Sequence, residues 1–500
     1  MRLAPESAEF AAAYEAGRPQ VVWTSLVADL ETPVSAFLKL AENRPYSFLL
    51  ESVEGGATRG RYSIIGLRPD LVWRCFGERA EINREALHAR DRFVADTLPT
   101  LPSLRRLIGA TRILLPPELP PMAAGLFGHM GYDMVRLMER LPDLNPDRLG
   151  LPDAVFVRPT LIAVFDNILD RVTLVTPVWP RPDLSARAAY DLAAERLADA
   201  IADFQRSLGH GMLRMASPPP QPRSNVSREQ YHEMVRRAKA YIMAGDIFQV
   251  VPSQRFTIPF TLPPFALYRA LRRLNPSPFL FFLDLDGYAL VGSSPEILVR
   301  VRDGKVTIRP IAGTRKRGTT RAEDEALARD LLSDPKEIAE HVMLLDLGRN
   351  DVGRVAEIGS VRVTERMIVE YYSHVMHIVS NVEGRLRADC DALDALIAGF
   401  PAGTVTGAPK IRAMEIIEEL EPERRGFYAG AVGYFAADGG MDTCITLRTA
   451  LVRGREMYVQ AGGGVVADSD PEAEYQESCN KARALIRAAE EAVSFAGRGG

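Results

Sequence analysis

Residues 227–251 read SREQYHEMVRRAKAYIMAGDIFQVV and contain a predicted helix followed directly by a strand. Ser227 and Gln230 have the form of a capping box, and apolar residues follow at the spacing of one helix face. Gly245 ends this helical pattern. The apolar run at 247–251 then predicts a buried strand. A helix that gives way to a strand so quickly indicates a fold in which both kinds of element share a core.

Helices and strands continue on both sides of this segment without a regular alternation. We expect strands at 47–52, 161–165, 289–291, 306–308, 429–434, 444–451 and 457–460. We expect helices at 185–208, 264–274, 322–332, 335–347, 411–420 and 471–495. This mixture argues against a doubly wound sheet and predicts an α+β fold. We expect a complex α/β sandwich of mainly antiparallel sheets surrounded by helices, with two closely associated subdomains.

A proline-rich stretch marks the clearest boundary in the chain. Because proline cannot donate to a sheet ladder and favours extended backbone, we interpret residues 216–226 as a linker between regions 1–215 and 227–495. The formal net charge of −4 offers no basic footprint for a nucleic acid. No apolar run is long enough for a membrane span, and the first residues do not resemble a signal peptide. Four scattered cysteines are typical of a reduced, cytoplasmic setting.

Two predicted helix starts each carry a pair of glutamates. An Asp-Pro pair begins each helix, at 334–335 and at 470–471, where Asp can cap and Pro can take the first helical position. Three-residue spacing then places two carboxylates on one helix face: Glu337 with Glu340, and Glu474 with Glu477. Either helix alone is also typical of an ordinary acidic N-terminus. If the two pairs meet, their oxygen atoms are suited to a hard divalent cation such as Mg²⁺.

Four further features are suited to an anion or to proton transfer. Residues 403–410 place small and hydroxyl side chains before a helix start, and the glycine run at 460–464 lets backbone amides approach a ligand. Arg448 follows a strand-like run and is suited to a carboxylate. A tight turn and a strand-end surface arginine are the alternative interpretations. His374 and His377 could exchange a proton near neutral pH, although their spacing allows at most one to face a cleft.

Several ordered blocks carry a resemblance to a known family. They are residues 245–253 (GDIFQVVPS), 309–315 (RPIAGTR), 340–341 (EH), 346–351 (DLGRND), 404–410 (TVTGAPK) and 462–469 (GGGVVADS). Taken together, the chain resembles the chorismate-utilising enzymes, and among them the component I chains of anthranilate synthases. The likeness covers most of the chain and is strongest from about 227 to 485.

The resemblance implies a role for each matching position. Glu340 and Glu477 are expected as direct Mg²⁺ ligands, with Glu337 and Glu474 close by. The implied contacts to chorismate are Tyr428, Arg448, Gly462, Gly463 and Gly464 at the enolpyruvyl carboxylate, Gly313 and Thr314 elsewhere, and Thr404, Gly407 and Ala408 along the pocket. His377 is expected as an acid that assists loss of the C4 hydroxyl, and Lys481 as positive charge beside the carboxylates. Gln249 and Thr314 complete the expected catalytic set.

Two positions separate the reaction types of the family. Relatives that add water to chorismate have a lysine base at the position of Gln249, and aminodeoxychorismate synthases have a lysine at the position of Ala312. The resemblance therefore implies attack by ammonia, followed by loss of pyruvate to give anthranilate, the first committed step of tryptophan biosynthesis. No glutaminase motif is found, so a separate glutamine amidotransferase subunit is expected, in a heterotetramer.

The N-terminal region resembles the regulatory part of the family. The implied positions for inhibitory tryptophan are Glu51, Ser52, Pro278, Phe279 and Leu280, the last a methionine in many relatives. The alternative is that residues 49–52 only form an edge of the sandwich core. Three functional rivals remain: the folate-pathway aminodeoxychorismate synthase, a phenazine- or salicylate-type chorismate enzyme, and an inactive subunit that senses tryptophan. Ala312, Gln249 and the four intact glutamates argue against them.

Overall fold

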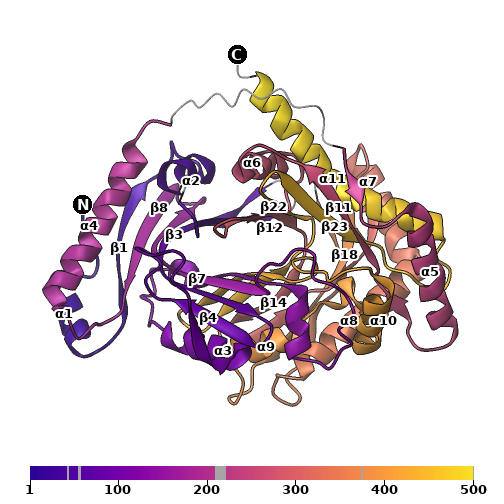
Figure 1. Cartoon of the computed structure of the whole chain (residues 1–500), viewed down its shortest axis with the longest axis horizontal. Helices are drawn as coiled ribbons and strands as arrows, with labels where there is room; N and C mark the ends of the chain where they lie inside the picture. The colour runs from indigo at the N-terminus through magenta and orange to yellow at the C-terminus, as the bar shows by residue number, and fades with distance from the viewer. Residues whose placement is uncertain (42–43, 55–57, 209–220, 373–374, 499–500) are drawn as a thin grey trace.

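The computed structural model describes residues 1–41, 44–54, 58–208, 221–372 and 375–498. Helices surround two stacked sheets, and the strand pairs within these residues are antiparallel (Figure 1). This arrangement confirms the α+β class.

The first sheet combines strands from both ends of the chain. Each strand pairs with the next in the order β1 (Gln20–Val27), β8 (Arg171–Val178), β7 (Ala154–Asp166), β3 (Thr58–Phe76), β2 (Phe48–Glu54), β12 (Phe279–Asp284), β13 (Ala289–Ser294), β22 (Thr449–Arg453), β23 (Glu456–Gly462), β11 (Ser253–Pro259) and β9 (Arg223–Ser224). The pairing of β2 with β12 places Ser52 opposite Phe279.

The second sheet shares two strands with the first. Its order is β5 (Val94–Pro99), β4 (Arg79–Asn83), β3, β7, β6 (Gly125–Met130), β20 (Ala431–Ala436), β21 (Met441–Ile445), β14 (Ile297–Arg302), β15 (Lys305–Ile308), β18 (Val375–Arg385) and β17 (Arg362–Tyr371), with β16 (Ile311–Lys316) beside β15 on β18. One end of β3 and β7 lies in the first sheet and the other end in the second, so these two strands connect the layers.

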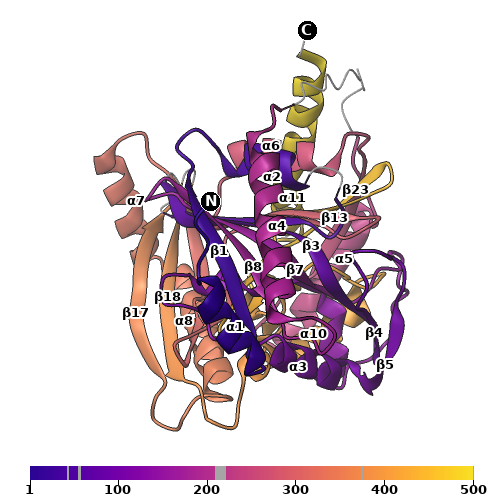
Figure 2. The same cartoon turned by 90° about the vertical axis from the view of Figure 1, so that its left-hand side faces the viewer.

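Helices cover the outer faces of both sheets. Apolar side chains of α1 (Ser7–Glu15), α2 (Pro33–Ala41), α4 (Ala186–Gln205), α6 (Pro264–Leu274) and α11 (Pro471–Arg498) pack on the first sheet. Those of α3 (Thr100–Ala110), α8 (Pro335–Gly353) and α9 (Ala392–Gly399) pack on the second. Figure 2 shows α4 lying across β1 and β8. A third apolar cluster, which includes Phe48, Phe127 and Phe281, lies between the sheets.

The remaining elements lie beside the sandwich or connect its strands. Helix α5 (Arg228–Met243) packs with α10 (Lys410–Leu420) around the short strand pair β10 (Gln249–Val250) and β19 (Gly407–Ala408). Helix α7 (Arg321–Ser333) packs on β18. The described residues also form three short 3₁₀ helices: η1 (Pro121–Ala123), η2 (Tyr132–Leu137) and η3 (Gly403–Val405).

Local signals for helices are confirmed, with one helix longer than expected. Ser227 Oγ accepts from the Gln230 amide at 3.2 Å, and Gln230 Oε1 accepts from the Ser227 amide at 2.7 Å, as a capping box requires. Helix α6 has the predicted bounds. Helix α8 continues six residues past the predicted end, because Gly348 and Val352 continue its buried face.

The strand predicted at 444–451 is wrong. The chain leaves β21 of the second sheet after Ile445 and enters β22 of the first sheet at Thr449. Arg448 has φ of +46°, a left-handed conformation that interrupts the regular extended backbone of a strand. The crossing between layers was not visible in the apolar pattern, because both flanking strands are buried.

The strand predicted at 247–251 is also shorter than expected. Only Gln249 and Val250 form β10, because their partner β19 has two residues. Phe248 is 71% exposed and does not belong to a buried strand.

The two regions of the chain share both sheets. Strand β2 pairs with β12, and β6 pairs with β20, so each layer contains strands from residues 1–215 and from residues 227–495. Within the expected linker, residues 216–220 lie outside the described residues, and β9 pairs with β11. Within the described ranges, no helix is long and apolar enough to cross a membrane.

We expect the packing between the sheets to contribute strongly to stability. Phe127 is 1% exposed and stacks on Phe48 at 4.5 Å between ring centroids. Phe127→Ala should lower the free energy of unfolding by about 3–5 kcal/mol through loss of buried surface and a residual cavity. Urea denaturation followed by tryptophan fluorescence measures this. Leu30→Ala, at a site 91% exposed, should change stability by less than about 0.5 kcal/mol. Equal effects of both substitutions would contradict a strong contribution of the apolar cluster between the sheets to stability.

Candidate active site

Helices α8 and α11 begin as the sequence indicates. The Asp334 carboxylate accepts from the Lys336 amide at 3.0 Å, and Asp470 Oδ1 accepts from the Ala473 amide at 2.9 Å. These caps fix the first turns of the two helices and with them the pairs of glutamates.

The glutamates of the two helices lie close enough to influence one another. Burial raises the pKa of Glu340, and the charges of Glu337 and Glu477 raise it further. Burial also raises the pKa of Glu474, again with a contribution from Glu477. Gln249 Nε2 donates to Glu340 Oε1 at 3.3 Å. The structure therefore brings the two acidic helix starts together beside β10.

Each of these carboxylates has a donor from the protein. Arg315 Nη1 donates to Glu337 at 2.9 Å, Lys481 Nζ to Glu477 at 2.7 Å, and Ser469 Oγ to Glu474 Oε1 at 2.7 Å. Among the described residues, no group of three or more His, Cys, Asp or Glu has an arrangement that could hold a metal ion.

The chemistry of the donor set nevertheless fits a hard cation. The set consists of oxygen atoms only. Glu474 Oε2 is buried without a hydrogen-bond partner in the described part of the chain, and a Cβ atom at Gly463 would lie 2.6 Å from it. A small divalent cation with oxygen ligands suits such a set.

Arg448 is the most distinctive group in the neighbourhood. Its position at the crossing between the two sheets buries the guanidinium, and burial lowers its pKa. No carboxylate or hydrogen-bond acceptor contacts this guanidinium among the described residues. Because a buried cation without a counter-ion is costly, the arrangement is suited to an anionic ligand.

The glycine turn after β23 lies against Tyr428 and the glutamates. A Cβ atom at Gly462 would lie 2.3 Å from the Pro252 carbonyl oxygen, so only glycine fits this close approach. Lys481 Nζ donates to the Gly462 carbonyl at 3.0 Å. Burial raises the pKa of Tyr428 to about 12, although the nearby Arg425 and the Gly462 amide lower it in part. A Cβ atom at Gly464 would lie 2.4 Å from Gln249 Nε2, which places the turn beside β10.

His377 lies on β18 next to the expected substrate contacts of β16. Its Nδ1 lies 3.0 Å from the Gly313 carbonyl oxygen and 3.1 Å from Thr314 Oγ1. Burial lowers the pKa of His377 and Arg448 lowers it further, against the effect of the Gly313 carbonyl. The ring is therefore neutral near pH 7, with Nδ1–H donating to Gly313 and Nε2 left as an acceptor. His374 lies outside the described residues.

The loop at 403–408 leads into β19, which pairs with β10. Gly407 has φ of +137°, and a Cβ atom there would lie 2.1 Å from the Gln249 carbonyl oxygen. Ala408 pairs with Gln249. Thr404 Oγ1 is buried and makes no hydrogen bond of good geometry within the described ranges, although it lies close enough to the Glu296 carboxyl to lower its pKa.

Glu296 was missed by the sequence analysis. It lies between β13 and β14, and burial raises its pKa to about 8, against the effects of the Thr404 hydroxyl and the Ile311 amide. A carboxyl with this pKa is mostly protonated at pH 7 and can donate a proton. No local pattern could have identified it, because its burial depends on strands from distant parts of the chain.

The five positions expected to bind tryptophan line one cavity between the sheets, of about 1110 Å³. Ser52, Pro278 and Phe279 are found along its wall. Glu51 and Leu280 turn their side chains to the other face of the first sheet. Glu51 accepts from Arg272 Nε at 2.6 Å and from Tyr268 Oη at 2.5 Å, and Leu280 packs in the core below α6. The cavity extends to Tyr372, whose ring lies 5.4 Å from that of His377.

Comparisons with known proteins agree with this arrangement. The family model described as chorismate binding enzyme matches residues 59–487. The chain is 60% identical over 495 residues to anthranilate synthase component 1 of Cereibacter sphaeroides, with 98% of both chains covered. It is 51% identical to the protein of that name from Thermus thermophilus, over 93% of this chain and 97% of the relative.

Solved structures give the same result. The crystal structure of anthranilate synthase component I from Streptococcus pneumoniae has a TM-score of 0.75 at 38% identity, covering 86% of this chain and 92% of that one. A menaquinone-specific isochorismate synthase from Escherichia coli, at 20% identity and a TM-score of 0.69, supports the fold alone. This chain therefore belongs to the chorismate-binding enzymes, and within that family to the anthranilate synthase component 1 enzymes.

Proposed function

We propose that the chain converts chorismate and ammonia into anthranilate and pyruvate, with Mg²⁺, as the first committed step of tryptophan biosynthesis. The names of its relatives support the reaction. The observation that carries the proposal is the buried Arg448 guanidinium, which has no counter-ion among the described residues and lies near His377. An anionic substrate supplies that counter-ion.

The anionic groups of chorismate have two complementary environments. Arg448, Tyr428 and the amides of 462–464 bind the enolpyruvyl carboxylate. Gly313, Thr314, Thr404, Gly407 and Ala408 line the rest of the pocket. Glu340 and Glu477 would hold the metal directly, with Glu337 and Glu474 beside them and Lys481 balancing their charge. When bound, Mg²⁺ neutralises the ring carboxylate and fixes the ring.

Ammonia needs no base on the protein for its activation. This agrees with Gln249 and Ala312, which stand at the two positions where other members of the family have a lysine. Ammonia attacks C2, the double bonds shift, and the C4 hydroxyl leaves as water after it gains a proton. Glu296 holds a proton at pH 7 and is suited to supply it, whereas neutral His377 would first have to take one up. In the second step His377 Nε2 accepts the C2 proton while the C3–O bond breaks. The ring becomes aromatic, and the released enolpyruvate takes up a proton at its methylene carbon to give pyruvate.

Regulation, partner and location complete the proposal. The cavity between the sheets is large enough for tryptophan, and Ser52, Pro278 and Phe279 line it. A component named 1 suggests a second component, for which we propose a glutamine amidotransferase in a cytoplasmic heterotetramer. Free ammonium should support a slower reaction of this chain alone.

The metal assignment is tested by removing single carboxylates. Glu340→Ala or Glu477→Ala should lower Mg²⁺-dependent formation of fluorescent anthranilate by more than about 100-fold, because outer partners of a metal site alone contribute about 10–100-fold. Glu472→Ala is a matched control on α11, since Glu472 pairs instead with Arg228 and His232. Normal turnover in either site variant would remove the assignment.

The role of His377 is tested by separating the two steps. His377→Gln should slow release of pyruvate by about 10²–10⁴-fold, the usual contribution of a positioned base. Chromatography of the reaction with ammonium should then show a non-aromatic amino intermediate. Anthranilate formation at the normal rate, or loss of the first step instead, would contradict this role.

Inhibition by tryptophan is tested at the cavity between the sheets. Ser52→Phe should raise the inhibitory concentration of tryptophan by about 10–100-fold, because overfilling a packed site costs about 1–3 kcal/mol. Anthranilate formation with ammonium should stay close to normal. Ser207→Phe makes the same change at an exposed position. If the Ser52 variant remained as sensitive as the Ser207 variant, the cavity would not be the inhibitor site.

A further inference from the structure

The connection at 421–428, between α10 and β20, holds two parts of the candidate site in place. Arg425 is 1% exposed, and its guanidinium donates to the Val405 carbonyl at 2.7 Å and to the Val251 carbonyl at 2.6 Å. Val405 lies in the 403–408 loop, which is assigned above to the chorismate pocket, and Val251 directly follows β10, the strand that contains Gln249. The same guanidinium lies 4.9 Å from the ring centroid of Tyr132 and 5.4 Å from that of Tyr428. One buried cation therefore joins three segments of the site.

Arg425 is itself held from both regions of the chain. Glu421, four residues earlier, pairs with it at 2.6 Å. Tyr132 comes from η2 in the N-terminal region, so the guanidinium lies between one aromatic ring from each region. A cation between two rings loses favourable contacts if either ring moves.

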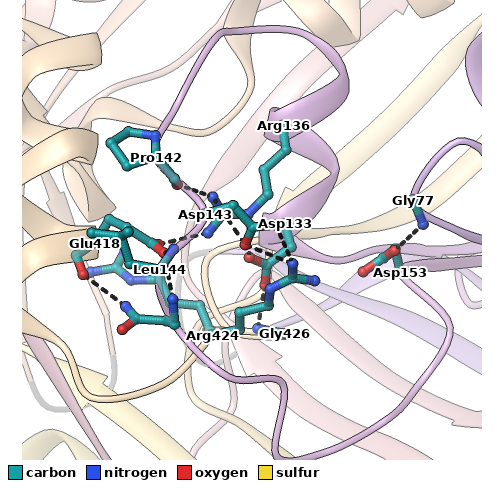
Figure 3. A network of polar contacts seen from close by, with 12 residues as sticks. Gly77, Asp133, Arg136, Pro142, Asp143, Leu144, Asp153, Glu418, Arg424 and Gly426 are labelled. Atoms are coloured by element: carbon teal, nitrogen blue, oxygen red, sulfur yellow. Dashed lines mark hydrogen bonds and ion pairs between the residues drawn. The ribbon is translucent and has the colours of Figure 1, made fainter.

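Side chains next to Tyr132 fasten the connection to the N-terminal region (Figure 3). Asp133 Oδ2 accepts from the Gly426 amide at 2.9 Å, and the Tyr132 amide donates to the Gly426 carbonyl at 2.7 Å. Arg136 donates from Nε to Asp133 at 3.1 Å and from Nη2 to Glu418 of α10 at 2.6 Å. We call Asp133, Arg136 and Glu418 the clamp.

A second set of bonds surrounds the clamp. Glu418 Oε1 accepts from the amides of Leu144 and Asn145 at 2.8 and 2.9 Å. Arg424 pairs with Asp143 at 2.7 Å. Because Asp133 and Glu418 are only 6% and 7% exposed, a shift of the connection would leave buried carboxylates without donors. The connection is therefore held in one position.

We propose that Asp133 and Arg136 are positioning residues for the chorismate site, acting through Gly426, Arg425 and Tyr428. The proposal rests on the function above, in which Tyr428 contacts the enolpyruvyl carboxylate. It gives the N-terminal region a role in substrate affinity that is separate from any inhibitor site.

Asp153 provides a matched control. It lies directly before β7, at the end of the segment that follows η2, it is partly buried, and burial raises the pKa of both Asp133 and Asp153. Its carboxylate, however, accepts from the Gly77 amide at 2.6 Å and not from the 421–428 connection. Asp133→Ala, Asp133→Asn and Asp153→Ala should be compared in the full chain, with ammonium and Mg²⁺. The measurements are KM for chorismate and for ammonium, kcat, the Kd for chorismate and the melting temperature.

Asp133→Ala should raise KM and Kd for chorismate by about 10–100-fold, since misplacement of a contact by about 1 Å has effects of this size. Its KM for ammonium should change less than its KM for chorismate, because Asp133 is connected to the end of β10 only indirectly, through Arg425 and the Val251 carbonyl. Asp133→Asn should be milder, because the amide oxygen can still accept from Gly426. Asp153→Ala should lower the melting temperature with normal KM values.

Two results would overturn the proposal. One is an Asp133→Ala protein with a lower melting temperature but unchanged KM and Kd for chorismate. The other is an equal rise of KM in Asp153→Ala. If Asp133→Ala does not fold, Glu418→Gln takes its place, and an unchanged Kd there has the same meaning. A wild-type chain that binds chorismate but forms no anthranilate would refute the proposed function. The comparison of Kd values would still show whether the clamp positions the chorismate site.

Discussion

Strands β3 and β7 belong to both sheets, and this sharing determines much of the molecule. It joins the layers along one side, so residues from both ends of the chain must complete each sheet. The chain then has to cross between layers after Ile445, and the crossing places Arg448 in a left-handed conformation inside the protein. A cation that would be exposed at a strand end is in this way buried without a counter-ion. The requirement for an anionic ligand follows from the topology.

Burial affects the neighbouring groups in different ways. It raises the pKa of Glu296 and Glu340, and it lowers the pKa of His377. A protonated carboxyl and a neutral imidazole thus lie in one region, one able to give a proton and the other able to accept one at pH 7. The same low-polarity surroundings strengthen the attraction of Arg448 for a carboxylate. Burial therefore determines the charge states on which the proposed binding and proton transfer depend.

The sequence was informative where short-range chemistry decides the structure. Caps at Ser227, Asp334 and Asp470 could be predicted because a cap and its helix are neighbours in the chain. The pairs of glutamates could be predicted for the same reason. The break at 446–448 could not, because the strand-like residues on both sides of it fit one strand as well as two. Glu296 escaped notice because its burial depends on distant strands, and the direction of Glu51 depends on its ion pair with Arg272 of α6.

The N-terminal region contacts the rest of the protein at several places. Strand β2 pairs with β12 along the cavity between the sheets, β6 pairs with β20, and η2 contacts the 421–428 connection through Asp133. The bond between Asp133 and Gly426 is separate from the pairing of β2 with β12. A region 227–495 expressed alone would lose the partners of β12 and β20 and would leave Glu418 and Arg425 without their N-terminal contacts. The boundary at the linker therefore separates stretches of sequence and not independent folding units.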